Sequence, residues 1–516
     1  MHSIPELQNK CNTVLFLGNN DESTDQQVSL LALQNEIVNY GLISDPNFSP
    51  TNPGYYHTTI VDIPFGQLFA LSQKFDLVAM LDQPQSHWSH WKCLLATFKL
   101  MCQLEELNKP TIFRSNQNAK KISYWQDLVY NKNKSFCIYP WINFNHTGKK
   151  LKLCARDGDN AGVTTLDQLQ SWSTDSKYGA VRKKMLEGTQ LPVNCNVCYE
   201  YEDRGIESYR QFETLDWVSQ LDLNSVDDLQ KIDRPYYYEI LLGNHCNIKC
   251  RGCQPAFSKP IGDEIKKFNI VPPANLSWEP DTPSIDQIDI EMLDEKTTVY
   301  FQGGEPTIMP EVLEFMDRCL EKNKVNFNLS MCTNGVKISD KFLNKISNFT
   351  NTNFSFSLDG FAHINDYWRS GSAWGKVISN AKLLKSQGHS ISINTVPGIY
   401  NVTNLHLLFE FLDREFPFTT VYLQINYLPW QSAFNHPNAN LVIDSMRKCM
   451  DTAIYRSNGK SCKTAIDSIY QYYYDNPTCD LTALKDFFNY NDQLDRARGV
   501  CLADYIPELE AARSLL

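Results

Sequence analysis

Residues 236–253 read YYYEILLGNHCNIKCRGC, and this stretch decides the fold. Its first seven residues are aromatic or aliphatic apart from Glu239, a composition typical of a buried strand that ends at the turn residues 243–244. Cys246, Cys250 and Cys253 follow at the spacing C-x3-C-x2-C on the predicted loop. Three thiolates on so short a loop suit an iron–sulfur cluster, whereas a structural zinc normally takes four ligands. Three cysteines would leave one iron of a four-iron cluster without a protein ligand.

Strand and helix patterns alternate after the cysteines. Five further strands are predicted at residues 297–301, 327–331, 354–358, 390–396 and 420–425, with helical segments such as 311–320 between them. Together with residues 236–242 they give six parallel βα units. The sequence therefore predicts an α/β fold with a partial, TIM-like (βα)6 barrel, whose strand-end loops all lie at one rim.

Short polar motifs follow these predicted strands. GGEP stands at 303–306, TNG at 333–335 and SLDG at 357–360. A Gly-Gly turn alone is weak evidence for a site, because most such pairs are only turns. Their shared position at strand ends, with the cysteines, indicates one rim site.

The cysteine motif and the three strand-end motifs, in this order, resemble the radical S-adenosylmethionine (SAM) enzymes over about residues 234–430. The resemblance implies that Cys246, Cys250 and Cys253 hold a catalytic 4Fe-4S cluster and that SAM chelates the open iron. It further implies that one electron cleaves SAM to a 5′-deoxyadenosyl radical, which abstracts hydrogen from a substrate. A flavodoxin or ferredoxin is the expected reductant.

The same resemblance assigns the SAM contacts. Glycines let backbone come close to a ligand, a glutamate helps to hold an ammonium, and a guanidinium is a planar partner for the methionyl carboxylate. Two assignments keep alternatives: Asp359 binds a ribose hydroxyl or caps the next helix, and Arg369 contacts SAM or lies on a solvated helix face. The implied SAM contacts are Gly303, Gly304, Glu305, Asn334, Ser357, Asp359 and Arg369.

A second cysteine group precedes the predicted barrel. It comprises Cys137, Cys154, Cys195 and Cys198. Four thiolates of this kind bind either zinc or a second iron–sulfur cluster. The stretch 137–210 resembles the twitch or half-SPASM auxiliary module of radical SAM proteins, which favours an auxiliary 4Fe-4S cluster, although that module usually follows the barrel. A fully ligated cluster suits electron transfer, so we expect an oxidative reaction.

Composition limits the other classes of function. The 516 residues include 48 Lys and Arg against 59 Asp and Glu, a net charge of −11 that gives no reason to expect a nucleic-acid or membrane partner. No apolar run approaches the length of a membrane span. Sixteen cysteines without an export signal indicate reduced thiols and a cytoplasmic protein. Cysteines outside the two groups are expected to be small buried hydrophobes, namely Cys11, Cys93, Cys102, Cys319, Cys332, Cys449, Cys462, Cys479 and Cys501.

The chain divides into four predicted parts. Residues 1–125 read as a small α/β domain of unassigned role, with strands at 14–17, 58–61 and 75–81 and helices at 25–40 and 88–107. Residues 126–225 form the cysteine-rich module, 226–430 the radical SAM core and 431–516 a helical C-terminal cap.

Three functions are compatible with these patterns. The first is a radical SAM enzyme that modifies a C–H bond of a peptide or protein side chain, because relatives with this auxiliary module often mature peptides. The second is a radical SAM dehydrogenase of a small molecule such as an aminocyclitol, a sugar or a nucleotide. The third is a non-catalytic metal-binding scaffold, for which the rim motifs would have no use.

Overall fold

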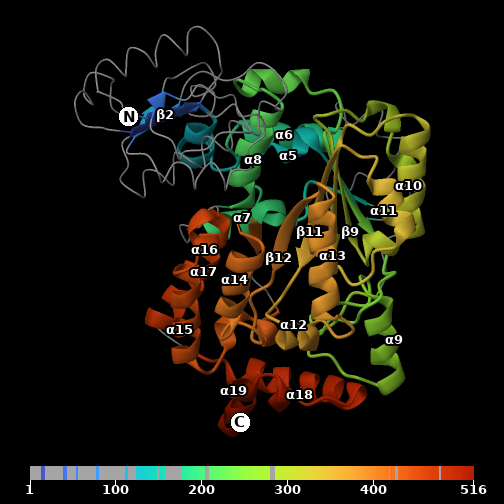
Figure 1. Cartoon of the computed structure of the whole chain (residues 1–516), viewed down its shortest axis with the longest axis vertical. Helices are drawn as coiled ribbons and strands as arrows, with labels where there is room; N and C mark the ends of the chain where they lie inside the picture. Colours follow the sequence, from blue (N-terminus) through green and yellow to red (C-terminus); the bar gives the residue numbers. More distant parts are fainter. Residues whose placement is uncertain are drawn as a thin grey trace. The chain divides into compact units, whose positions relative to one another are not determined.

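Figure 1 presents the structure, a computed structural model of the chain. The residues it describes are 13–17, 39–42, 54–55, 77–80, 111–113, 124–147, 150–157, 176–203, 208–278, 285–417, 419–424, 428–458, 460–475 and 478–516. The chain divides into two compact units. The first unit comprises residues 1–138 and 210–231, and the second comprises residues 139–209 and 232–516.

The first unit contains a parallel five-stranded sheet in the order β3-β2-β1-β4-β5. Its strands are β1 (Thr13–Leu17), β2 (Asn39–Leu42), β3 (Gly54–Tyr55), β4 (Leu77–Met80) and β5 (Thr111–Phe113). The predicted strands at 14–17 and 75–81 are confirmed as β1 and β4. The helix predicted over 25–40 is wrong at its end, where Asn39 and Tyr40 pair with β1 as part of β2. The predicted strand at 58–61 and helix at 88–107 lie outside the described residues.

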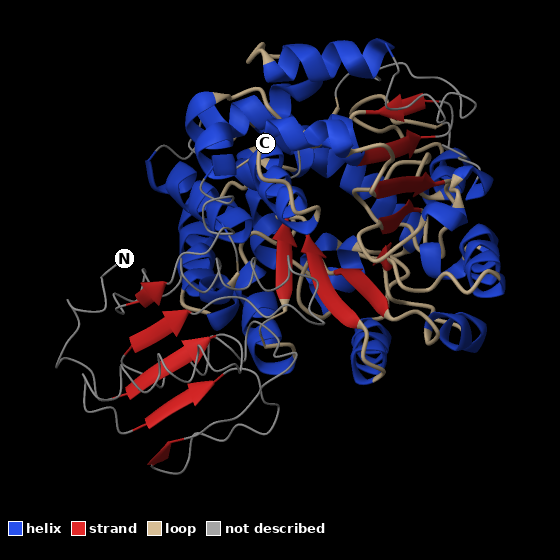
Figure 2. Cartoon of the chain, turned by 90° about the horizontal axis from the view of Figure 1, so that it is seen from above, coloured by secondary structure: helices blue, strands red, loops and turns tan. Residues whose placement is uncertain are grey.

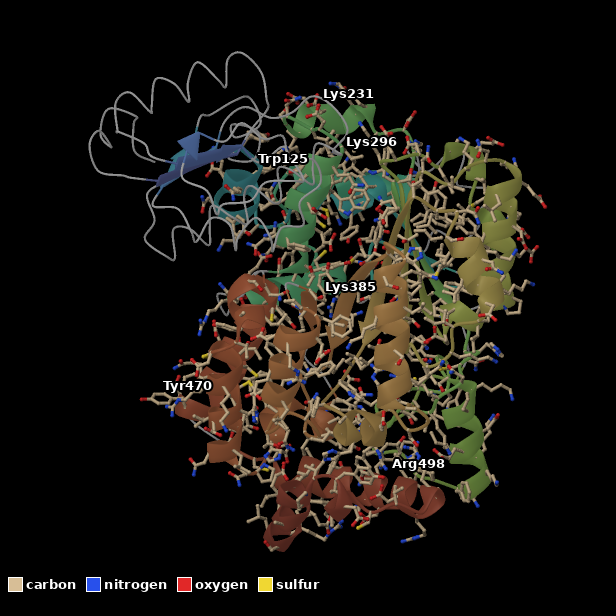
Figure 3. The ribbon with its side chains drawn as sticks, viewed as in Figure 1. Trp125, Lys231, Lys296, Lys385, Tyr470 and Arg498 are labelled. Carbon is tan, nitrogen blue, oxygen red and sulfur yellow. The ribbon has the colours of Figure 1, made fainter. Side chains whose placement is uncertain are left out.

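The remainder of the first unit is held together by buried polar contacts. It includes the π-helix Asp127–Lys132, most of α8 (Tyr209–Gln220) and the 3-10 helix Val226–Lys231. Arg210 is 1% exposed and donates to the carbonyl oxygens of Val129 and Phe136. Trp125, labelled in Figure 3, donates from its indole nitrogen to the Leu223 carbonyl oxygen. Since a buried donor without an acceptor is costly, these bonds fix this segment.

The second unit is built on an eight-stranded sheet in the order β13-β12-β11-β10-β9-β8-β6-β7. Seven strands run parallel, and β7 closes an antiparallel hairpin with β6 at one edge. The strands are β6 (Asn143–Thr147), β7 (Lys150–Lys152), β8 (Tyr237–Leu242), β9 (Thr298–Gly303), β10 (Asn328–Thr333), β11 (Asn351–Ser357), β12 (Ser390–Thr395) and β13 (Thr420–Leu423). All six predicted strands are confirmed, and the fold is the predicted partial barrel. Strand β6, which sequence analysis missed, extends it.

Helices cover the outer face of this sheet, as Figure 2 shows. Alternate strand residues such as Phe301, Met331 and Phe354 point outward and are 0–1% exposed, because they pack against the helices in one hydrophobic core. The covering helices in this core include α10 (Pro310–Glu321), α11 (Asp340–Ile346), α13 (Trp374–Ser386) and α14 (Leu405–Glu415). The helices α9 (Lys259–Phe268) and α12 (His363–Trp368) pack in two separate hydrophobic clusters.

Further helices flank the barrel strands in sequence. Before β8 come α5 (Tyr139–Ile142), α6 (Ser176–Leu186) and α7 (Pro192–Asp203). After β13 come α15 (Ala439–Met450), α16 (Ala453–Ser457), α17 (Lys460–Asp475), α18 (Leu481–Arg498) and α19 (Pro507–Glu510). Within the described part of the chain, no helix combines the length and the apolar character needed to cross a bilayer.

The isolated cysteines divide by environment. Cys319, Cys449 and Cys462 are 0% exposed, as predicted for small buried hydrophobes. The prediction is wrong for Cys501, which is exposed just after α18. Cys479 and Cys332 are half-buried, whereas Cys11, Cys93 and Cys102 lie outside the described residues.

Phe315 of α10 provides a test of the core. Its ring is 0% exposed and lies 5.2 Å from Phe301 and 6.0 Å from Phe327, measured between ring centroids. We expect Phe315→Ala to lower the free energy of unfolding by about 3–5 kcal/mol in chemical denaturation, because it leaves a cavity. Phe268→Ala on α9, at a ring that is 46% exposed, should change it by less than about 1 kcal/mol. Equal effects would contradict this packing.

Candidate functional site

The three cysteines of the C-x3-C-x2-C motif lie on one loop, residues 243–258, between β8 and α9. The loop is closed on itself, because Asn244 donates from its side chain to the Pro255 carbonyl and Ser258 donates to the Ile248 carbonyl. Cys246, Cys250 and Cys253 carry free, half-buried thiols. Each thiol interacts electrostatically with another of the three. The predicted ligands are therefore brought together.

Burial dominates the chemistry of these thiols. It raises the pKa of Cys246 to about 12 and also raises the pKa values of Cys250 and Cys253. At Cys250 the charges of Arg369 and Arg498 oppose this shift. These thiols would therefore keep their protons in the absence of a metal. An iron–sulfur cluster binds the thiolate form, so its irons would replace the thiol protons.

Within the described residues, no group of three or more His, Cys, Asp or Glu side chains is arranged to hold a metal ion. An iron–sulfur cluster needs its ligands farther apart than a single metal ion does, because each thiolate binds a different iron. The three thiols fit that donor set, because they are soft ligands, free of disulfides and half-buried.

The segment after α12 lies along the cysteine loop. The backbone N–H groups of Lys249 and Arg251 donate to the carbonyl oxygens of Ser370 and Trp368, both at 2.8 Å. Arg369 lies between these two acceptors in sequence, and its Nη1 contacts the Cys250 sulfur at 3.8 Å. These bonds place a guanidinium beside the middle cysteine.

Arg369 is not a solvated helix residue. Its side chain is 15% exposed and forms a 2.7 Å ion pair with Asp359. Burial by itself would lower the pKa of Arg369, but Asp359 and Cys250 outweigh that effect and raise it, so the guanidinium stays charged. Its Nε is buried without a hydrogen-bond partner. An unsatisfied donor of this kind marks a position where an anionic group is favourable.

Asp359 is fixed at the end of β11. Its carboxylate accepts from the Val396 N–H at 2.8 Å, besides its ion pair with Arg369. It does not cap the following helix, because the N-cap of α12 is Ala362. Asp359 therefore orients Arg369 and links the ends of β11 and β12.

Gly303 and Gly304 lie against the cysteine loop. The N–H of Gly304 donates to the Gly243 carbonyl and that of Glu305 to the His245 carbonyl, both at 2.8 Å. A Cβ on Gly303 would lie 1.9 Å from the Leu242 carbonyl oxygen, and a Cβ on Gly304 would lie 2.3 Å from that of His245. The close backbone approach that these glycines allow is therefore to the end of β8 and to the cysteine loop that follows it.

Glu305 joins two of the strand-end loops. It is 1% exposed, and its carboxylate accepts from the N–H and hydroxyl of Thr307, the hydroxyl of Thr333 and the N–H of Asn334. Burial raises the pKa of Glu305, while these hydrogen bonds oppose the shift. The carboxylate thus fixes the loops after β9 and β10 relative to each other.

Asn334 and Ser357 complete the predicted set. Asn334 donates from its side chain to Asn247 at 2.8 Å and contacts the Cys246 sulfur at 3.8 Å. The hydroxyl of Ser357 lies 3.4 Å from the sulfur of Cys332, to which Asn394 also donates. Cys332 is therefore part of a polar cluster, and its predicted role as a simple buried hydrophobe is wrong.

The inner face of the sheet is polar. Its side chains alternate with the outward-facing core residues, and register places Glu239 beside Tyr300, and Cys332 beside Ser355. A closed TIM barrel fills this space with branched apolar side chains. Here several inward residues are half-buried or exposed, namely Tyr300, Gln302, Cys332, Asn353, Asn394 and Tyr422.

The second cysteine group is spread over both units. Cys137 is buried in the first unit. In the second unit, Cys154 follows β7 and accepts from the N–H of Arg156 at 3.3 Å. Cys195 and Cys198 lie on α7, one turn apart and therefore on one helix face.

Sequence analysis missed two residues of the cysteine loop and their partners. Lys249 and Arg251 flank Cys250, and both contact helix α18 through Arg498 and Asp495. Because Arg251 and Asp495 are 244 residues apart in the chain, no local pattern links them.

Residues 240–411 match the model of the Radical SAM superfamily, so the chain contains a radical SAM domain. No curated protein matches the chain. Among solved structures, native anSMEcpe with bound AdoMet and a Cp18Cys peptide aligns at 18% identity and a TM-score of 0.29, over 42% of this chain and 58% of that chain. Streptococcus suis SuiB bound to S-adenosylmethionine aligns at 17% identity and a TM-score of 0.30, over 64% and 68%. SuiB bound to precursor peptide SuiA gives 16% and 0.28, over 61% and 64%.

Gly303→Ala tests the backbone contact between β9 and the end of β8, from which the cysteine loop starts. The residue has φ +113° and meets the Leu242 carbonyl, so strain and a clash add. We expect a loss of about 3 kcal/mol or more in the free energy of unfolding by chemical denaturation. Gly388 is a matched control, since its φ is +91° but a Cβ there meets nothing within 4 Å. Gly388→Ala should cost only the strain, about 1–2 kcal/mol, and a similar cost for both would refute the contact.

Proposed function

We propose that this protein is a radical SAM enzyme that modifies a C–H bond of its substrate. The observation that carries the proposal is the convergence of two strand-end segments and the segment after α12 on a loop with three free thiols. Those segments contain Gly304, Asn334 and Arg369, and each contacts the loop. A zinc scaffold would not require a charged guanidinium with an unsatisfied donor beside a thiol.

Cys246, Cys250 and Cys253 would hold the catalytic 4Fe-4S cluster. SAM would bind beside it, at Gly303, Gly304, Glu305, Asn334, Ser357, Asp359 and Arg369. When bound, the cluster and SAM supply one-electron cleavage to a 5′-deoxyadenosyl radical that abstracts hydrogen.

The protein's own part in this chemistry is positioning. Arg369 offers a permanently charged guanidinium to a carboxylate, and Asp359 holds that guanidinium in place. Glu305 fixes the strand-end loops, because all its acceptors face protein donors. The outer core and the covering helices exclude water from the far side of the sheet.

We further propose that Cys137, Cys154, Cys195 and Cys198 bind an auxiliary 4Fe-4S cluster. The presence of Cys195 and Cys198 on one face of α7 supports a shared ligand set. Full thiolate ligation would suit electron transfer from a substrate radical, and so an oxidative reaction. A redox-neutral product with SAM regenerated in every turnover would contradict this part.

The proposed substrate is a peptide or protein side chain. The polar inner face favours a substrate with hydrogen-bonding groups, and Glu239 supplies a buried carboxylate there. A flavodoxin or ferredoxin would supply the electron. A short precursor peptide encoded beside this protein would support the proposal, whereas neighbouring sugar or nucleotide enzymes would favour a small-molecule dehydrogenase.

Cys250→Ala tests the catalytic assignment. In anaerobically reconstituted protein, the wild type should contain about eight irons per chain and release 5′-deoxyadenosine after addition of dithionite and SAM. The variant should lose that release and retain about four irons. Cys501→Ala, at an exposed thiol, is the control and should behave as wild type. Retained cleavage in Cys250→Ala would refute the assignment.

The double variant Cys195→Ala/Cys198→Ala tests the auxiliary cluster. We expect about four irons per chain and continued 5′-deoxyadenosine release in the absence of substrate, because the catalytic ligands are intact. Cys319→Ala/Cys449→Ala, which also removes two thiols, is the control and should leave the iron content unchanged. Zinc in place of iron at this site in the wild type would overturn the auxiliary-cluster proposal.

A further inference from the structure

Helix α18 contacts the cysteine loop on both sides of Cys250. On one side, the guanidinium of Arg251 is 1% exposed and donates to Asn491 at 2.7 Å and to Asp495 at 2.6 Å. On the other, Arg498 donates to the carbonyl oxygen of Lys249 at 3.0 Å. The helix therefore fixes both residues adjacent to the middle cysteine.

A buried ion pair anchors Arg498 itself. Its guanidinium bonds Glu264 of α9 at 2.6 Å, and both side chains are 3% exposed. Glu264 also pairs with Lys249. Gly499, with φ +66°, ends the helix directly after Arg498, which places this cation at the favourable C-terminal end of the helix dipole. Figure 3 shows Arg498 at this end of α18, close to α9.

The same helix shields the loop from solvent. Tyr490 and Leu494, one turn apart, are 3% and 0% exposed and pack with isoleucines of α9 in a cluster that Cys253 joins. Asn491, Asp495 and Arg498 follow the same periodicity one position later. One helix thus presents adjacent apolar and polar stripes to the cysteine loop.

Arg498 also carries an unused donor. Its Nη1 is buried and has no hydrogen-bond partner. The charge of Arg498 acts on the Cys250 thiol, together with that of Arg369, whose Nε is likewise unsatisfied. One guanidinium thus contacts the Cys250 sulfur and the other bonds the backbone of the residue before it, and each has an unsatisfied donor. Such an environment favours an anionic, sulfur-rich group, since hydrogen bonds and positive charge near the sulfurs stabilise a reduced cluster.

We infer that Arg498 is a positioning residue of the catalytic cluster, which holds the cysteine loop and tunes the cluster's reduction potential, and that α18 shields this site. The inference rests on the proposed function. It assigns to the C-terminal segment, outside the matched residues 240–411, a direct part in the cluster's environment.

The test compares three variants on anaerobically reconstituted full-length protein. Arg498→Gln removes the charge, Arg498→Lys keeps it, and Arg496→Gln removes an exposed charge from the same helix. The measurements are iron and sulfide content, the midpoint potential by EPR-monitored titration, and the rate of cluster loss in air.

We expect Arg498→Gln to lower the midpoint potential and to accelerate cluster loss severalfold, because a cation beside the reduced cluster is gone. Arg498→Lys should restore most of the potential, and Arg496→Gln should match the wild type. If Arg498→Gln does not fold, a midpoint potential in Arg498→Lys that equals the wild type supports the charge role. A midpoint potential that falls in Arg498→Lys, where the charge is kept, would overturn it.

The outcomes separate this inference from the proposed function. A wild-type protein that binds no iron, or that loads clusters without cleaving SAM, would overturn the proposed function and the inference with it. A wild type that loads and cleaves, beside an Arg498→Gln variant that equals Arg496→Gln in potential and in air lifetime, would overturn the inference alone.

Discussion

Backbone hydrogen bonding between the cysteine loop and the strand-end segment of β9 is the constraint on which the site depends. Gly304 and Glu305 donate to the carbonyls of Gly243 and His245, so the two segments run in contact. A side chain at 303 or 304 would meet a carbonyl oxygen well inside van der Waals distance. This contact sets where Glu305 lies, and Glu305 in turn fixes Thr333 and Asn334. The positions of the strand-end loops are therefore coupled.

A second set of contacts places charge around the thiols. Arg369 reaches Cys250 from the segment after α12, and Arg498 acts on it from α18. Each guanidinium is paired with a buried carboxylate, Asp359 or Glu264, which offsets the cost of desolvation. Each also retains one unsatisfied N–H. The site thus combines two positive charges with unsatisfied N–H donors. Its carboxylates, Asp359 and Glu264, are already paired with these guanidiniums.

The two faces of the sheet serve different purposes. The outer face packs aromatic and aliphatic side chains against helices and supplies the stability of the second unit. The inner face is polar, and Cys332 bonds there with Asn394 beside Ser357. A face of this kind contributes little to the core, which is consistent with a surface kept for a ligand.

The sequence by itself determined the local features of this protein. Alternation of strand and helix patterns located all six predicted strands, and spacing placed three cysteines on one loop, because both depend on neighbours in the chain. Tertiary structure decided the rest. It added β6 to the sheet and placed Asn39, the predicted end of a helix, in a strand. It also placed Cys332 among polar side chains rather than in the hydrophobic core. It also brought Asp495 to Arg251 across 244 residues. Contacts of that kind arise when distant elements pack together. A buried charged side chain needs a hydrogen-bonding partner, but the sequence around it does not show which distant residue will be that partner.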